Sequence, residues 1–148
     1  IVTREELLTL FPSHYTVITD LESYEGCGPL AGIYSAMMYK EAERYVVLPC
    51  DMPLIDAAIL EQLLYRHQTE ITIVEVAERL QPLISVWDRS VKEKLAESLE
   101  KQQYRLRDVF DSTSIMKVAG EALTEYEEIF MNVNTLKQDK EMRRWLKS

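Results

Sequence analysis

Two aspartates in this sequence each follow a short apolar run and precede a helical segment. Asp20 comes after Thr16-Val17-Ile18-Thr19, and Asp51 comes shortly after Tyr45-Val46-Val47-Leu48. Apolar runs that alternate with helices are typical of buried parallel strands. Ligands of open α/β sheets bind outside the carboxyl ends of the strands. We therefore expect both carboxylates on one edge of the sheet, where a carboxylate can hold Mg²⁺ and leave positions for phosphate and water. Taken singly, each aspartate is more often an ordinary turn or cap residue.

Glycine is rare, and three of the four glycines lie in Gly26-Cys27-Gly28-Pro29-Leu30-Ala31-Gly32. This stretch follows the first apolar run and opens a helix predicted over residues 33–43. Glycines let backbone amides approach a nucleotide closely, and the amino end of a helix favours negative charge. The spacing fits neither the dinucleotide fingerprint nor a P-loop. A plain tight turn explains the spacing equally well.

Two further segments carry polar groups beside predicted strands. Gln81 and Pro82 begin a strand predicted over residues 83–87. Asn132 and Asn134 place two carboxamides on one face of a strand predicted over 129–133. Their amides can bind a ligand, but either asparagine can also cap the helix that follows.

The remaining elements position these groups in an α/β fold with a doubly wound, mostly parallel sheet. Further strands are expected at residues 70–76 and 114–118, and the later strands are expected to be mixed in direction. Capping residues predict helices that begin near Thr3, Asp56, Ser90 and Thr135. Residues 1–3 are expected to be the end of a strand that starts upstream.

Composition restricts the class of function. The 148 residues fit one domain with a sizeable core. A net charge of −8 argues against binding nucleic acid, which requires clustered Lys and Arg. No apolar run is long enough to span a membrane, and the first residues do not resemble a signal peptide, so a cytoplasmic protein is expected. Cys27 and Cys50 are expected to be small buried thiols, and the histidines are too far apart for a zinc site.

Four motifs together resemble the molybdenum cofactor guanylyltransferase family in order and spacing, across essentially the whole chain. They are Gly28-Pro29-Leu30-Ala31-Gly32, Pro49-Cys50-Asp51-Met52-Pro53, Gln81-Pro82-Leu83 and Asn132-Val133-Asn134. The resemblance implies a Rossmann-like nucleotidyltransferase fold with three α/β/α layers. It also implies transfer of GMP from GTP to molybdopterin-bound molybdenum, which releases pyrophosphate and forms the guanine dinucleotide cofactor.

The resemblance also implies roles for individual residues. Asp51 matches the catalytic Mg²⁺ ligand that contacts GTP, and Asp20 matches a second GTP-contacting aspartate. The other positions on the GTP side are Gly28, Pro29, Leu30 and Gly32. The positions on the molybdopterin side are Asn132, Asn134, Gln81 and Pro82. Other cofactor-biosynthesis proteins and apo-molybdoenzymes are the protein partners that the family implies.

One departure from the family pattern keeps other functions open. The family opens with a strand and a Leu-Ala-Gly-Gly loop whose Arg and Lys cradle the triphosphate, and this chain contains no such segment. The single domain at residues 1–148 is therefore expected to lack its first strand and phosphate loop. The alternatives are a related cytidylyl or sugar-phosphate nucleotidyltransferase, and a non-catalytic nucleotide-binding module.

Overall fold

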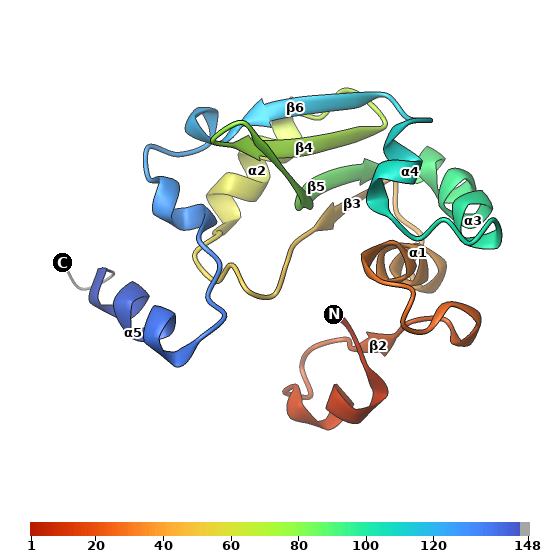
Figure 1. Cartoon of the computed structure of the whole chain (residues 1–148), viewed down its shortest axis with the longest axis horizontal. Helices are drawn as coiled ribbons and strands as arrows, with labels where there is room; N and C mark the ends of the chain where they lie inside the picture. Colours follow the sequence, from red (N-terminus) through yellow and green to blue (C-terminus); the bar gives the residue numbers. More distant parts are fainter. Residues whose placement is uncertain (146–148) are drawn as a thin grey trace.

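A computed structural model describes residues 1–145, apart from the side chains of residues 136, 137, 141 and 145. Strands and helices are interspersed along the chain (Figure 1). The strands are β1 (Val2–Thr3), β2 (Ile18–Thr19), β3 (Arg44–Val47), β4 (Ile71–Val76), β5 (Arg79–Asp88) and β6 (Ile115–Ala119). The α-helices are α1 (Pro29–Tyr39), α2 (Ala57–Arg66), α3 (Lys92–Glu100), α4 (Leu106–Phe110) and α5 (Leu136–Trp145). The 3₁₀ helices are η1 (Glu5–Leu10), η2 (Glu22–Tyr24), η3 (Arg89–Val91), η4 (Gly120–Ala122) and η5 (Glu127–Phe130).

The main sheet has four strands in the order β3-β5-β4-β6. β5 runs antiparallel to both of its neighbours, and β4 runs parallel to β6. Three of the four strands therefore point the same way, and the reversed β5 lies between two of them. The α/β class is confirmed, and the sheet is mixed, as the later strands led us to expect.

The first two strands form a separate sheet. β1 pairs with β2 in parallel, with Thr3 opposite Thr19, and both strands lie beside α1 (Figure 1). β1 confirms a strand within residues 1–3. The expectation that Asp20 and Asp51 share an edge of one sheet is wrong, because β2 bonds to β1 and not to the strand that precedes Asp51.

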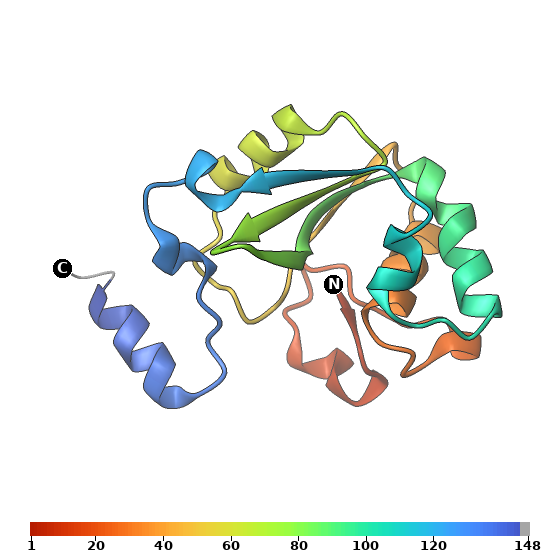
Figure 2. The same ribbon diagram turned by 45° about the horizontal axis from the view of Figure 1, so that its top comes forward.

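Helices cover both faces of the main sheet, so the three layers are confirmed. One buried cluster joins α1, α3 and α4 to the face that carries Ile71, Ile73 and Trp87. The other joins α2 to the face that carries Val74, Ile84 and Val86. Neighbouring residues of a strand serve opposite clusters because side chains alternate across a sheet. Figure 2 shows the two groups of helices on opposite sides of the strands.

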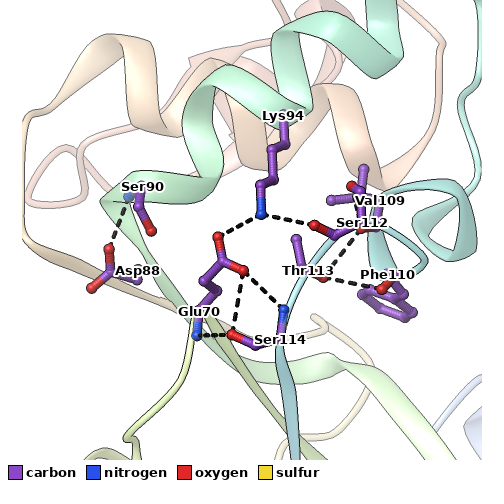
Figure 3. Close-up of polar contacts among 9 residues, drawn as sticks. All are labelled: Glu70, Asp88, Ser90, Lys94, Val109, Phe110, Ser112, Thr113 and Ser114. Carbon is purple, nitrogen blue, oxygen red and sulfur yellow. Dashed lines mark hydrogen bonds and ion pairs between the residues drawn. The ribbon is translucent and has the colours of Figure 1, made fainter.

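A polar cluster ties α3 to the starts of β4 and β6 (Figure 3). Glu70 accepts a hydrogen bond from Lys94 Nζ at 2.6 Å and another from the backbone amide of Ser114 at 2.8 Å. Lys94 also donates to the backbone oxygen of Ser112 at 2.8 Å. The charged hydrogen bond from Lys94, followed by the Ser114 amide, lowers the pKa of the Glu70 carboxyl. This cluster fixes the amino ends of the parallel strands, opposite the edge where ligands of α/β sheets bind.

The strand predicted over residues 129–133 is wrong. Residues 127–130 form η5, and Phe130 is buried in the cluster beneath α2. The backbone amide of Val133 donates to the Asp51 carbonyl oxygen at 2.7 Å and does not enter a sheet. The apolar residues that suggested a strand thus bury one aromatic ring and attach an extended segment to the loop after β3.

Candidate functional site

The glycine-rich stretch turns directly into α1. Gly28 precedes the helix with a φ of 78°, in the left-handed region that favours glycine, and Pro29 takes the first helical position. Helix α1 therefore starts at Pro29, earlier than the predicted residue 33. Leu30 is fully buried and anchors the first turn in the core. Gly28 and Pro29 consequently lie at the amino end of α1, where the free backbone amides favour an anion.

Asp20 lies against this helix start. A Cβ atom added to Gly32 would lie 3.6 Å from Asp20 Oδ1, so the carboxylate packs close to the helix backbone. Asp20, Gly28, Pro29 and Gly32 line one pocket of about 300 Å³ together with Val2, Thr3 and Arg4. The sequence-predicted GTP-side residues Asp20, Gly28, Pro29 and Gly32 are therefore neighbours, whereas Leu30 points into the core and does not line the pocket.

Partial burial affects the pKa of the Asp20 carboxyl. Desolvation raises the pKa of its carboxyl, and the hydrogen bond with the Gly26 backbone partly offsets this by lowering it. A partly desolvated carboxylate gains more from a hydrogen-bonding ligand than an exposed one does, because solvent screens the interaction less.

Asp51 lies in the loop after β3, beyond the carboxyl end of that strand. Asn132 Nδ2 donates to Asp51 Oδ2 at 3.1 Å. The Val133 amide bonds to the Asp51 carbonyl oxygen beside it. The two sequence-predicted residues Asp51 and Asn132 are thus brought together, although 81 positions separate them.

The donor set around Asp51 suits a hard cation that also binds phosphate. Oδ2 accepts from Asn132, and Oδ1 accepts no hydrogen bond from any described residue. Within the described part of the chain, no three Asp, Glu, His or Cys side chains converge as a metal site. Mg²⁺ commonly binds through one or two carboxylates and takes its remaining ligands from water and substrate phosphates. A single partly exposed carboxylate fits that pattern and does not fit an all-protein metal cage.

The other predicted molybdopterin-side residues form no hydrogen bond with Asp51 in the described part of the chain. Gln81 pairs with Val74 near the start of β5, which is the carboxyl end of β4. Pro82 follows at a bulge in the same strand. Asn134 donates its backbone amide to Gln138 Oε1 at 2.9 Å, at the start of α5. Thr135 Oγ1, and not the Asn134 carboxamide, accepts from the Gln138 backbone amide at 3.2 Å.

The predicted residues form two groups, and no hydrogen bond among described residues joins them. One group surrounds Asp20 at the start of α1, and the other surrounds Asp51 and Asn132. Arg4, which lines the first pocket, was missed because the sequence placed it inside a capping box. Arg4 could have been found from its position directly after a strand end, because Asp20 was found from an equivalent position.

No helix formed by residues 1–145 is long and apolar enough to cross a bilayer.

Comparison with known proteins finds relatives of most of this chain. Residues 1–118 match the model of the MobA-like NTP transferase domain. A Bacillus cereus (strain AH187) protein named probable molybdenum cofactor guanylyltransferase is 34% identical over 123 residues, which are 80% of this chain and 60% of that protein. A Bacillus cytotoxicus protein of the same name is 34% identical over 128 residues, covering 85% and 64%. The chain thus spans about 60% of the length of the first of these relatives.

Two solved structures share the fold. Molybdopterin-guanine dinucleotide biosynthesis protein A from Archaeoglobus fulgidus superposes with a TM-score of 0.78 at 21% identity, over 99% of this chain and 77% of that chain. A protein from Aquifex aeolicus VF5 superposes with a TM-score of 0.74 at 24% identity, over 90% and 69%.

Proposed function

Because this chain belongs to the MobA-like NTP transferase family, we propose that it transfers GMP from GTP to the molybdopterin-bound molybdenum cofactor. The products are the guanine dinucleotide form of the cofactor and pyrophosphate. The Bacillus relatives carry the name of this activity, and four motifs of this sequence resemble the molybdenum cofactor guanylyltransferase family. The protein works in the cytoplasm in this proposal, with GTP and molybdopterin as substrates and with apo-molybdoenzymes and other cofactor-biosynthesis proteins as partners.

The observation that carries the proposal is the hydrogen bond between Asn132 and Asp51. The family resemblance implies that Asp51 binds the metal and GTP, and that Asn132 lies on the molybdopterin side. A transfer reaction requires the two substrates to meet, so residues of the two sides must be neighbours. Their contact at 3.1 Å supports a site in which the acceptor phosphate approaches the nucleotide beside Asp51.

The chemistry requires positioning more than proton transfer. The terminal phosphate of molybdopterin attacks the α-phosphorus of GTP, and the bond to the leaving pyrophosphate breaks in line. The nucleophile is already anionic, so no general base is needed, and orientation supplies much of the rate. Mg²⁺, when bound, offsets the charge that develops on the phosphates.

The residues of this chain have distinct tasks in this scheme. Asp51 holds the cation, and Asn132 orients the Asp51 carboxylate through the hydrogen bond from its amide. Asp20 and the start of α1 at Gly28 hold the nucleotide. Asn134, Gln81 and Pro82 contact the molybdopterin side.

The direct test is turnover with purified chain, GTP, Mg²⁺ and molybdopterin-bound molybdenum. We expect pyrophosphate and the guanine dinucleotide cofactor in equal amounts, and no product when EDTA removes the cation. Preference for CTP in the same assay would favour the cytidylyl alternative. Nucleotide binding without turnover would favour the non-catalytic module.

A further inference from the structure

The pocket beside α1 carries two side chains of opposite charge at equivalent positions. Thr3 and Thr19 are directly paired across the parallel strands β1 and β2. Arg4 and Asp20 are the residues that follow them, so both lie side by side at the same end of the small sheet. Both line the pocket of about 300 Å³, with Val2 and Pro29 as apolar wall and the backbone of Gly28 and Gly32 beside them.

Arg4 remains available to a ligand. Its one ion pair among the described residues is with Glu6 at 3.4 Å, and both side chains are well exposed, at 77% and 64%. An exposed ion pair of this kind contributes little and is readily exchanged. Arg4 does not cap the η1 helix that follows it, since no hydrogen bond from its side chain forms there. Arg4 is the one basic residue among the described lining of this pocket.

A guanidinium and a carboxylate side by side can bind the acceptor groups and the donor groups of one guanine base. Guanine presents acceptors at O6 and N7, which arginine binds with two hydrogen bonds. Its N1–H and 2-amino groups are donors, and a carboxylate is an acceptor-only group with room for both. Adenine has an amino group in place of O6 and no N1 hydrogen, so it satisfies neither arrangement.

We propose that Arg4 selects guanine by binding O6 and N7 in this pocket, while Asp20 accepts from the opposite part of the base edge. The proposal rests on the proposed function, because it assumes that the nucleotide is the guanylyl donor. The free amides at the start of α1 attract a phosphate, but the full negative charge of Asp20 in the same pocket opposes it. The neutral, flat base avoids that repulsion and gains contact with the apolar wall.

The test is titration of the whole chain, by calorimetry, with GTP, 7-deaza-GTP, which lacks the N7 acceptor, and ATP. The unaltered chain is expected to bind GTP at least about tenfold more tightly than ATP, and to bind 7-deaza-GTP less tightly than GTP. In Arg4→Gln the affinity for GTP falls about tenfold, and the difference between GTP and 7-deaza-GTP disappears. Glu6→Gln is the matched control, because it removes the ion pair and keeps the guanidinium. It is expected to bind all three nucleotides as the unaltered chain does.

Each outcome decides a different point. If Arg4→Gln weakens GTP, 7-deaza-GTP and ATP by the same factor, Arg4 binds phosphate or ribose and the assignment is overturned, while the proposed function stands. If Arg4→Gln changes no affinity, the assignment is likewise overturned. If the unaltered, folded chain binds no GTP, the proposed function fails and the assignment fails with it. Circular dichroism of each variant establishes that the exposed substitution leaves the fold intact.

Discussion

Asn132 donates from Nδ2 to the Oδ2 atom of Asp51 over 3.1 Å, across 81 positions of sequence. The Val133 backbone amide bonds to the carbonyl oxygen of Asp51 at 2.7 Å. Two adjacent residues of the segment after η5 therefore hold both the side chain and the backbone of one aspartate. Asn132 is exposed, so the pair lies at the surface where substrates can reach it.

Asn132→Ala tests whether this contact belongs to the molybdopterin side. We expect the KM for molybdopterin to rise about tenfold, while the Kd for GTP changes by less than about twofold. Asn134→Ala is expected to act in the same direction. Steady-state kinetics with each substrate varied in turn, together with a GTP titration, separate the two effects. An equal loss of GTP affinity in either variant contradicts the assignment.

Asp51→Asn tests the metal role with almost no change of shape. We expect kcat to fall by at least about a hundredfold, because the cation loses its only charged ligand among the described residues. The thermal unfolding midpoint should stay close to that of the unaltered chain, since the Asp51 side chain is partly exposed. Asp111→Asn, at the end of α4, is the matched control and should keep full activity. Normal turnover of Asp51→Asn would exclude a metal role.

Gly32→Ala and Gly28→Ala should have opposite effects. Gly32 lies within α1, and an added methyl meets Asp20 Oδ1 at 3.6 Å and Val2 Cγ1 at 3.7 Å, which are ordinary contacts. The fold should tolerate it, with a gain of up to about 1 kcal/mol from helix propensity, while nucleotide affinity falls because the methyl fills the pocket. A Cβ added at Gly28 has no atom within 4 Å, but the backbone of Gly28 has a φ of +78°. Denaturant unfolding should show a loss of about 1 to 2 kcal/mol. Similar stability of the two variants would contradict the backbone argument.

Glu70→Gln should weaken the attachment of α3 to the sheet. The folded state lowers the pKa of the Glu70 carboxyl, chiefly through Lys94 at 2.6 Å. A lowered carboxyl pKa contributes stability above the ordinary value, and this is lost as pH falls through the folded-state value. At pH 7 we expect a loss of about 1 kcal/mol in unfolding free energy, and the gap to the unaltered chain should close in acid.

Glu97→Gln is the control for that experiment. Glu97 forms an ion pair of the same 2.6 Å length with Lys101, but both side chains are exposed, at 64% and 60%. Solvent screens that pair, so its loss should be far smaller. If both substitutions had the same effect on urea unfolding, the partly buried cluster would have no special role.

His67 should make stability depend on pH near neutrality. Its side chain is buried, and Nδ1 lies 2.8 Å from Thr72 Oγ1. Burial, followed by the charge of Arg44, lowers the pKa of the imidazole, while Asp88 partly offsets this. The folded state therefore resists protonation, and stability falls as pH drops below the unfolded value of about 6.5.

Unfolding free energies of the unaltered chain and His67→Gln, measured from about pH 7.5 to about pH 5.5, check this effect. We expect the advantage of the unaltered chain to shrink as pH falls. His14→Gln, which changes an exposed histidine that packs on Tyr15, is the control variant. A constant difference between the unaltered chain and His67→Gln would contradict the argument.

The strands that carry the main sheet could be predicted because their apolar runs are strong and local. The runs near Tyr45, Ile71 and Ile115 became β3, β4 and β6 within about one residue of the expected bounds. The hairpin between β4 and β5 could not be predicted in the same way. Its two-residue turn uses Ala77 and Glu78 at φ 47° and 62°, positions where Asn and Gly normally provide the signal.

The order of the strands depends on contacts that no local pattern contains. β5 enters between β3 and β4, and it contains three residues, 82–84, that have no partner on β4. Pro82 has no amide hydrogen to give to the ladder, which accounts for the irregularity at that point. The position of Pro82 was visible in the sequence, but the identity of the strand beside β5 was not.

The candidate site likewise has parts that the sequence predicted and parts that it did not. Asp20 and Asp51 were found from strand ends, which are local features. The contact of Asn132 with Asp51 depends on the path of the chain after η5, which the apolar pattern of residues 129–133 misrepresented. The neighbourhood of Arg4 and Asp20 depends on the pairing of β1 with β2, and two-residue strands leave almost no periodic signal.

The outer side of β3 is an edge of the main sheet within the described residues. Within residues 1–145, β3 bonds to β5 alone, so its other row of amides and carbonyls has no strand partner. Val46 and Leu48 are 38% and 44% exposed beside that row. Unpaired strands with exposed apolar side chains are templates for intermolecular sheets. A further strand can therefore join the sheet at this edge of β3, and replacing Val46 with lysine should discourage such pairing.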